Sequence, residues 1–191
     1  MTEQLPGRVK VVEVGPRDGL QNEQQQVPTE TKIELVLRLA DAGLPVVEAT
    51  SFVSPRWIPQ LADAEQVMAG IGKRPDTVFP VLVPNIQGLE RAVLAGADEI
   101  AVFTAASEEF NRKNINAGIQ ESMVRIRGIA EQAGASGLRV RGYVSCVLGC
   151  PYQGQVATET VELPCGASKS EKAETSCCST EKEVVNNKQP G

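Results

Sequence analysis

The sequence of 191 residues contains no histidine. Histidine is the commonest acid–base side chain at neutral pH and the commonest protein ligand of transition metals. Its absence excludes every Ser-His-Asp, Cys-His or histidine–metal mechanism that this chain could carry out alone.

Long apolar runs and a basic face are also missing. No apolar run approaches the roughly 20 residues that cross a bilayer. The N-terminal residues MTEQLPGRVK have neither a hydrophobic signal core nor an Arg- and Ser-rich presequence. The formal net charge of -5 gives no reason to expect nucleic acid as a partner. We therefore expect a globular cytoplasmic protein that binds neither membranes nor nucleic acid.

The five cysteines never form a C-x-x-C pair. Cys146 and Cys150 lie in the part of the chain with regular patterning, whereas Cys165, Cys177 and Cys178 lie near its end. This spacing favours reduced thiols in a reducing compartment over a disulfide framework.

Strand-like and helix-like segments alternate along the first 156 residues. Runs rich in β-branched residues predict strands at Val9–Val14, Pro45–Ser51, Thr77–Val83, Glu99–Phe103 and Arg139–Ser145. Helical spacing of apolar residues predicts helices at Thr29–Ala42, Pro59–Ile71, Ile86–Ala95 and Ile119–Ala133, the first with Thr29 as N-cap and Gly43 as stop. This order predicts an α/β fold with a parallel sheet. It does not separate an open sheet from a (β/α)8 barrel, which five strands would not close.

Residues 157–191 have a different composition, rich in Ser, Thr, Glu and Lys and without any aromatic residue. Such a segment cannot bury enough apolar surface to offset its ordering entropy. We expect one domain over residues 1–156 and a disordered tail over residues 157–191.

The first predicted strand ends in Gly15-Pro16-Arg17-Asp18-Gly19. Pro, Asp and Gly in this order are typical of a turn. At the C-terminal end of a strand, however, Asp18 could also be an oxygen ligand for a divalent cation, and Arg17 could stabilise an enolate. Polar residues such as Glu48 and Tyr143 in or near the other strand ends favour a shared site, although each alone is compatible with a structural role.

Four segments in the same order resemble the hydroxymethylglutaryl-CoA lyase family. They are VEVGPRDGLQNE (12–23), EATSFVSPRWIPQLAD (48–63), NRKNIN (111–116) and RGYVSCVLGCPYQG (141–154). The resemblance covers about residues 8–156. It implies a TIM (β/α)8 barrel that cleaves hydroxymethylglutaryl-CoA to acetyl-CoA and acetoacetate, a step of leucine degradation and ketone body formation.

The resemblance also implies roles for five residues. Asp18 would bind the divalent cation, Mg2+ or Mn2+, and Arg17 would hold the thioester carbonyl as it becomes an enolate. Glu48 and Tyr143 would be further catalytic residues, and Asn114 would contact the acyl-CoA substrate together with Arg17. These residue types suit a hard cation and a developing oxyanion.

The sequence departs from the family pattern in two places. The family's His-x-His metal ligands are absent, and so is the second Gly-Cys-Pro-Tyr segment that carries its catalytic cysteine. Cys150, in the first such segment, is therefore interpreted as structural. A single carboxylate holds Mg2+ weakly. We expect an incomplete barrel of about five βα units, with little or no lyase activity on its own.

Three other interpretations stay open. The chain could be an inactive fragment that binds CoA esters or pairs with an intact homologue through its open edge. It could be a self-sufficient open α/β domain that binds a small acid. It could also resemble the acyl-CoA condensing synthases of the same superfamily, which share Arg-Asp-Gly-x-Gln with residues 17–21. Family members tend to dimerise, so a homo-oligomer is also possible.

Overall fold

The computed structural model describes residues 7–161, in which parallel strands alternate with helices. The strands are β1 (Val12–Glu13), β2 (Val46–Val47), β3 (Thr50–Ser51), β4 (Val81–Leu82), β5 (Glu99–Ala105) and β6 (Arg139–Ser145), and the helices are α1 (Thr29–Asp41), α2 (Ala64–Ile71), α3 (Ile86–Leu94), α4 (Glu108–Ile115) and α5 (Ile119–Ala135). The described residues divide into two compact units, one of residues 7–101 and 132–139 and the other of residues 102–131 and 140–161.

In the first unit, β2 and β3 are the two ends of one extended segment. The backbone N–H of Glu48 donates to the carbonyl of Glu13 in β1 (2.7 Å). The N–H groups of its two neighbours, residues 47 and 49, point the other way and donate to the carbonyls of residues 78 and 80, just before β4 (both 3.0 Å). β1 pairs with β2, β3 with β4, and β4 with β5, all in parallel. The predicted parallel α/β fold is therefore confirmed.

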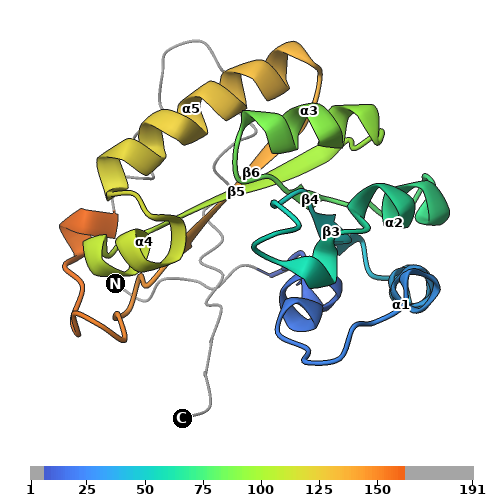
Figure 1. The fold of residues 1–191 in the computed structure, drawn as a ribbon, viewed down its shortest axis with the longest axis horizontal. Coiled ribbons are helices and arrows are strands. Elements are labelled where there is room, and N and C mark those ends of the chain that lie inside the picture. Colours follow the sequence, from blue (N-terminus) through green and yellow to red (C-terminus); the bar gives the residue numbers. More distant parts are fainter. Residues whose placement is uncertain (1–6, 162–191) are drawn as a thin grey trace. The chain divides into compact units, whose positions relative to one another are not determined.

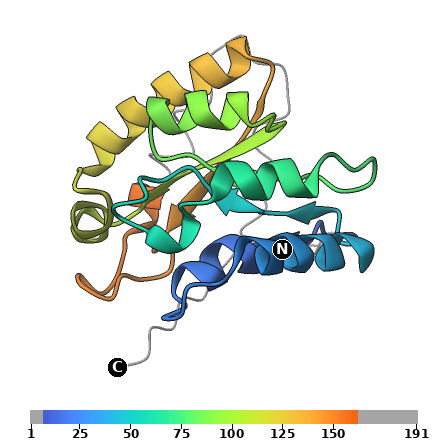
Figure 2. The same cartoon turned by 45° about the vertical axis from the view of Figure 1, so that its right-hand side comes forward.

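Helices α1 and α2 pack against each other, as Figures 1 and 2 show from two directions. Gly70 lies so close to Ile33 of α1 that any added side chain would force that isoleucine to move. The apolar face of each helix packs with the strands to form the core. Fully buried side chains of this core include Val36, Val46, Val47, Phe52, Leu61, Val67, Val81, Val83, Leu89 and Ile100.

The N-terminal turns of two predicted helices differ from the prediction in their cap or in their helix type. Thr29 is the first residue of α1 rather than its cap, and its hydroxyl donates to Asp63 Oδ2 (2.7 Å). The predicted helix Pro59–Ile71 is a 3-10 turn at Pro59–Leu61 followed by α2. At the other end of α1, Gly43 has a φ of 88°, which confirms it as the stop because this conformation favours glycine.

The second unit is held together by a buried hydrogen-bond network. Thr104 of β5 and Ser122 of α5 share a bond of 2.7 Å between their hydroxyl oxygens. Asn111 of α4 donates its amide to both of these oxygens (3.1 and 3.2 Å). Buried polar groups cost free energy unless they are paired, so this network fixes α4 against the strand and α5.

Helix α4 is a regular element that the spacing of apolar residues does not predict. Ser107 caps its N-terminus by accepting from the N–H of Phe110 (3.1 Å), and Asn116 ends it with a left-handed φ of 50°. A helical turn also covers residues 158–161. Residues 162–191 of the predicted tail lie outside the described residues. Within residues 7–161, no helix is long and apolar enough to span a membrane.

Candidate active site

The Arg17-Asp18 pair lies in a single tight turn directly after β1. Residues Gly15–Gly19 form a π-helical turn in which the N–H of Asp18 donates to the carbonyl of Val14 (2.7 Å). The Glu13 carboxylate accepts from the N–H of Gly15 (2.6 Å) at the start of this turn. The backbone that carries Arg17 is therefore fixed from both sides.

The guanidinium of Arg17 is bound by two carboxylates. Its Nε donates to Glu48 Oε1, and its Nη1 donates to Asp18 Oδ1 (2.6 Å). The Glu48 side chain is fully buried, whereas those of Arg17 and Asp18 are 12% and 23% exposed. The structure thus brings together three of the five predicted site residues, although Glu48 lies 31 residues after Arg17 in the chain.

This geometry suits a group that binds a partly negative oxygen. The bonds through Nε and Nη1 fix the plane of the guanidinium from two directions. A guanidinium that is already oriented needs little reorganisation when an oxyanion develops beside it. The two carboxylates outweigh the one positive charge, so the cluster also favours a cation near the partly exposed Asp18.

The donor set for a metal ion is incomplete in the part of the chain that the structure describes. No group of three or more His, Cys, Asp or Glu side chains in residues 7–161 could hold a metal ion. Asp18 already shares one oxygen with Arg17. Since Mg2+ needs several converging oxygen ligands, Asp18 alone does not form a complete site.

Two further residues belong to this neighbourhood and were not assigned from the sequence. Glu13 caps the turn that carries Arg17, a role that its place inside a strand does not reveal. The hydroxyl of Thr50, two residues beyond Glu48, is buried and has no hydrogen-bond partner among the described residues. An unpaired buried hydroxyl is unfavourable by itself.

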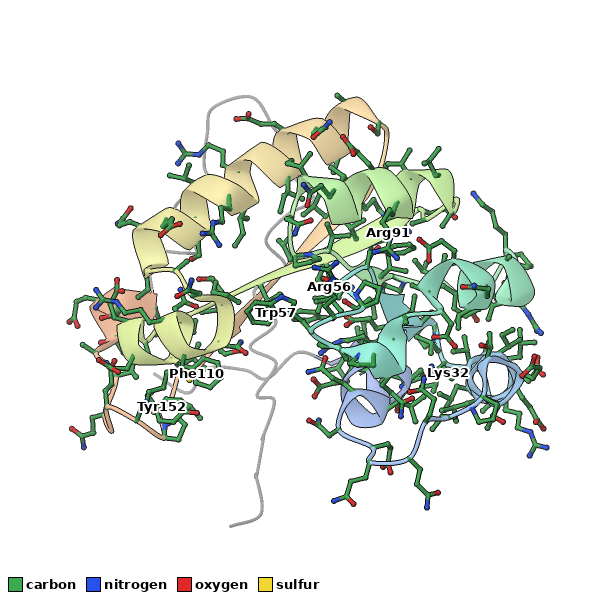
Figure 3. All side chains as sticks on the ribbon, in the orientation of Figure 1. Lys32, Arg56, Trp57, Arg91, Phe110 and Tyr152 are labelled. Carbon is green, nitrogen blue, oxygen red and sulfur yellow. The ribbon has the colours of Figure 1, made fainter. Side chains whose placement is uncertain are left out.

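A cleft of about 390 Å³ lies beside the segment that follows the turn. It is lined by residues 21–24, Gln26 and residues 57–60, and most of these side chains are polar. Trp57, which Figure 3 labels, is 75% exposed. The volume falls within the range of small-molecule sites, roughly 300–1,000 Å³, but the lining is more polar than usual.

The other two predicted site residues, Asn114 and Tyr143, belong to the second unit. Asn114 lies on α4 and is exposed, whereas Asn111, from the same NRKNIN segment, is buried in the network that anchors the helix. Tyr143 lies half-buried in β6. Lys113 of α4 lies over the ring of Tyr152. The ring of Tyr152 also contacts that of Phe110, and Figure 3 labels both residues.

The first unit is therefore a parallel α/β structure with charged side chains just beyond the C-terminal ends of its strands, where enzymes of this class place their sites. The sequence also matches a family model. The chain belongs to the HMGL-like family, whose model covers residues 8–173. The predicted resemblance is confirmed.

Several relatives of this chain are hydroxymethylglutaryl-CoA lyases. The mitochondrial lyase of Rattus norvegicus is 59% identical over 157 residues, which are 82% of this chain and 48% of the relative. Mitochondrial and cytoplasmic lyases both occur among the matching proteins. The chain spans about half the length of the curated relatives it matches.

Solved lyase structures have the same fold. A hydroxymethylglutaryl-CoA lyase from Pseudomonas aeruginosa aligns with a TM-score of 0.82 and 49% identity, over 85% of this chain and 54% of that one. An HMG-CoA lyase from Acinetobacter baumannii, solved with coenzyme A and 3-methylmalate, aligns with a TM-score of 0.77 and 37% identity, over 81% and 50%. The predicted barrel-type fold is confirmed over the part that aligns.

Proposed function

We propose that this chain carries the acyl-CoA-binding half of a hydroxymethylglutaryl-CoA lyase site. The observation that carries the proposal is the Arg17 guanidinium, fixed by Glu48 and Asp18 at the C-terminal end of β1. The lyase cleaves a carbon–carbon bond and leaves a thioester enolate, whose oxygen becomes negative. A positive group fixed beforehand stabilises that charge without moving.

Each predicted site residue has a role in this proposal. Arg17 holds the thioester carbonyl, Glu48 orients Arg17 through their buried bond, and Asn114 contacts the acyl-CoA. Tyr143 is a further catalytic residue. The coenzyme A bound to the Acinetobacter baumannii lyase supports a CoA ester as the substrate class.

Asp18 is the proposed carboxylate for the divalent cation, Mg2+ or Mn2+. Such an ion would polarise oxygen atoms of the substrate. Because the chain has no histidine and the described residues offer no group of three ligands, we expect weak metal binding and derive no step through the metal. The proposed activity of the chain by itself is binding with little or no cleavage.

The experiment compares binding with turnover in the purified full-length chain. Acetyl-CoA is titrated by isothermal calorimetry, and acetoacetate release from hydroxymethylglutaryl-CoA is measured with Mg2+ present. We expect saturable binding and acetoacetate at background level. A turnover near ordinary enzyme rates, roughly 1–1,000 per second, would contradict the proposed inactivity, and a lack of binding would contradict the proposed site.

A matched pair of variants tests whether binding uses the proposed residues. Replacing the exposed Asn114 by alanine removes one hydrogen bond to the ligand and is expected to weaken acetyl-CoA binding about fivefold. Gln120→Ala removes another exposed amide and is expected to leave binding unchanged. Both variants should keep the thermal stability of the parent. Equal affinities for the two variants would remove Asn114 from the site.

We further propose a cytoplasmic, self-associating protein. Cytoplasmic lyases among the matching relatives support the compartment. Cell fractionation and analytical ultracentrifugation test the two statements separately.

A further inference from the structure

We propose that Cys146 and Cys150 form a redox-active pair that closes to an intramolecular disulfide when a peroxide oxidises it. This property is separate from the proposed lyase site. Both cysteines are reduced in the structure and belong to the second unit, with Cys146 partly exposed and Cys150 buried.

The geometry brings several hydrogen-bonding groups to the sulfur of Cys150. The hydroxyl oxygen of Ser107 lies 2.9 Å from this sulfur, and the N–H of Tyr152 donates to it over 3.4 Å. The thiol of Cys146 is also hydrogen-bonded to it. A structural cysteine packed only for its volume has no need of such partners, which stabilise a thiolate.

The backbone turns sharply at Cys146 and again directly after Cys150. Cys146 has a left-handed φ of 62°, which non-glycine residues rarely adopt. The backbone of Cys150 exchanges two hydrogen bonds with Gly154 (2.7 and 2.9 Å). The chain after β6 thus turns back on itself, and the thiols of Cys146 and Cys150, four positions apart, are hydrogen-bonded to each other.

The two thiols differ in acidity. Burial raises the pKa of Cys150, but the hydrogen bonds from Ser107, from the backbone N–H groups of Gln153 and Tyr152, and from Cys146 together leave this pKa below its ordinary value. Burial, the adjacent Cys150 and their hydrogen bond raise the pKa of Cys146 to about 11. Cys150 is therefore the nucleophile of the pair, and Cys146 is the thiol that resolves the intermediate.

The reaction balances with one peroxide. The Cys150 thiolate attacks a peroxide oxygen, the O–O bond breaks, and with one proton this gives a sulfenic acid and water. Cys146 then attacks the Cys150 sulfur, so that the S–S bond forms and the S–O bond breaks. The departing hydroxide takes the Cys146 proton and leaves as a second water. Two electrons pass from the two thiols to the peroxide.

The test uses the full-length chain with Cys165, Cys177 and Cys178 replaced by serine, which leaves only this pair. After treatment with one equivalent of hydrogen peroxide, we expect a mass loss of two hydrogen atoms and protection of both thiols from iodoacetamide. Treatment with a reducing phosphine should restore both alkylation sites. Two thiols that remain open to alkylation, or a disulfide-linked dimer, would overturn the proposal.

Single variants in this background identify the order of events. In Cys146→Ser, a dimedone adduct should appear on Cys150, without the loss of two hydrogen atoms. In Cys150→Ser, Cys146 should stay unmodified at neutral pH. A dimedone adduct on Cys146 but none on Cys150 would overturn the assigned roles. Circular dichroism before oxidation serves as the control for folding.

Discussion

Replacing Arg17 by glutamine is expected to lower the free energy of unfolding by about 3–5 kcal/mol. The substitution takes the guanidinium away from the fully buried Glu48 carboxylate, while that negative charge stays inside the protein. It also removes the bond to Asp18. Urea denaturation followed by far-ultraviolet circular dichroism measures the effect. Because domains of this size are stable by only about 5–15 kcal/mol, the loss should be visible in the midpoint.

Two controls assign this loss to the buried pair. The double variant Arg17→Gln with Glu48→Gln removes both charges, so it should be destabilised by less than the sum of the two single variants. Lys73→Gln breaks an ion pair with Asp98 whose side chains are 70% and 59% exposed. Its cost should stay below about 1 kcal/mol. If Arg17→Gln costs no more than Lys73→Gln, the buried pair contributes nothing particular to stability.

The sequence predicts the elements that bury a continuous apolar face. β6 has the predicted bounds, Arg139–Ser145, and α1, α3 and α5 begin at their predicted residues. Helix α4 is missed because its buried side chain, Asn111, is polar and is held by hydroxyl groups from β5 and α5. A stripe of apolar residues cannot indicate a helix that is anchored by hydrogen bonds. The cap at Ser107 followed by two glutamates is the local signal that could have found it.

The candidate site, like the fold, could be predicted only in part from the sequence. Local chemistry alone predicts a turn at Arg17-Asp18, and the structure confirms it as a π-helical turn. The function of the two side chains stays a prediction. The bond from Arg17 to Glu48 depends on the alignment of β1 with β2, which no local pattern encodes. The roles of Asn114 and Tyr143 stay predictions. These roles follow from the resemblance to the family. Measurements of acetyl-CoA binding, and not the observed fold, can test them.

Replacing Lys32 by methionine is the second change with a large expected effect, again about 3–5 kcal/mol. Lys32 lies on α1, and its side chain is only 3% exposed. Its ammonium group donates to both carboxylate oxygens of Asp63 (2.8 and 3.0 Å) and to the carbonyl of Gln60. Figure 3 labels Lys32 on this helix. Methionine keeps the apolar stem, so the variant isolates the loss of the charge.

The same helix provides the matched control for Lys32. Arg38 pairs with Glu34 one turn away (2.6 Å), but their side chains are 76% and 59% exposed. Arg38→Gln should therefore cost only about 0.3–0.5 kcal/mol in the same denaturation experiment. Equal costs for the two variants would show that burial of the Lys32–Asp63 pair does not matter.

The loss of Lys32 should also reach the segment that follows the Arg17 turn. Gln60, whose carbonyl Lys32 binds, accepts from the N–H of Val27 (3.0 Å) and donates to the carbonyl of Gln25 (2.8 Å). These bonds connect the 3-10 turn at Pro59–Leu61 to the loop that lines the cleft. We expect faster hydrogen exchange at the Val27 N–H in Lys32→Met, and not in Arg38→Gln, because only the first variant frees the groups that hold this loop. Unchanged exchange at Val27 in a folded Lys32→Met variant would show that Gln60 holds the loop without Lys32.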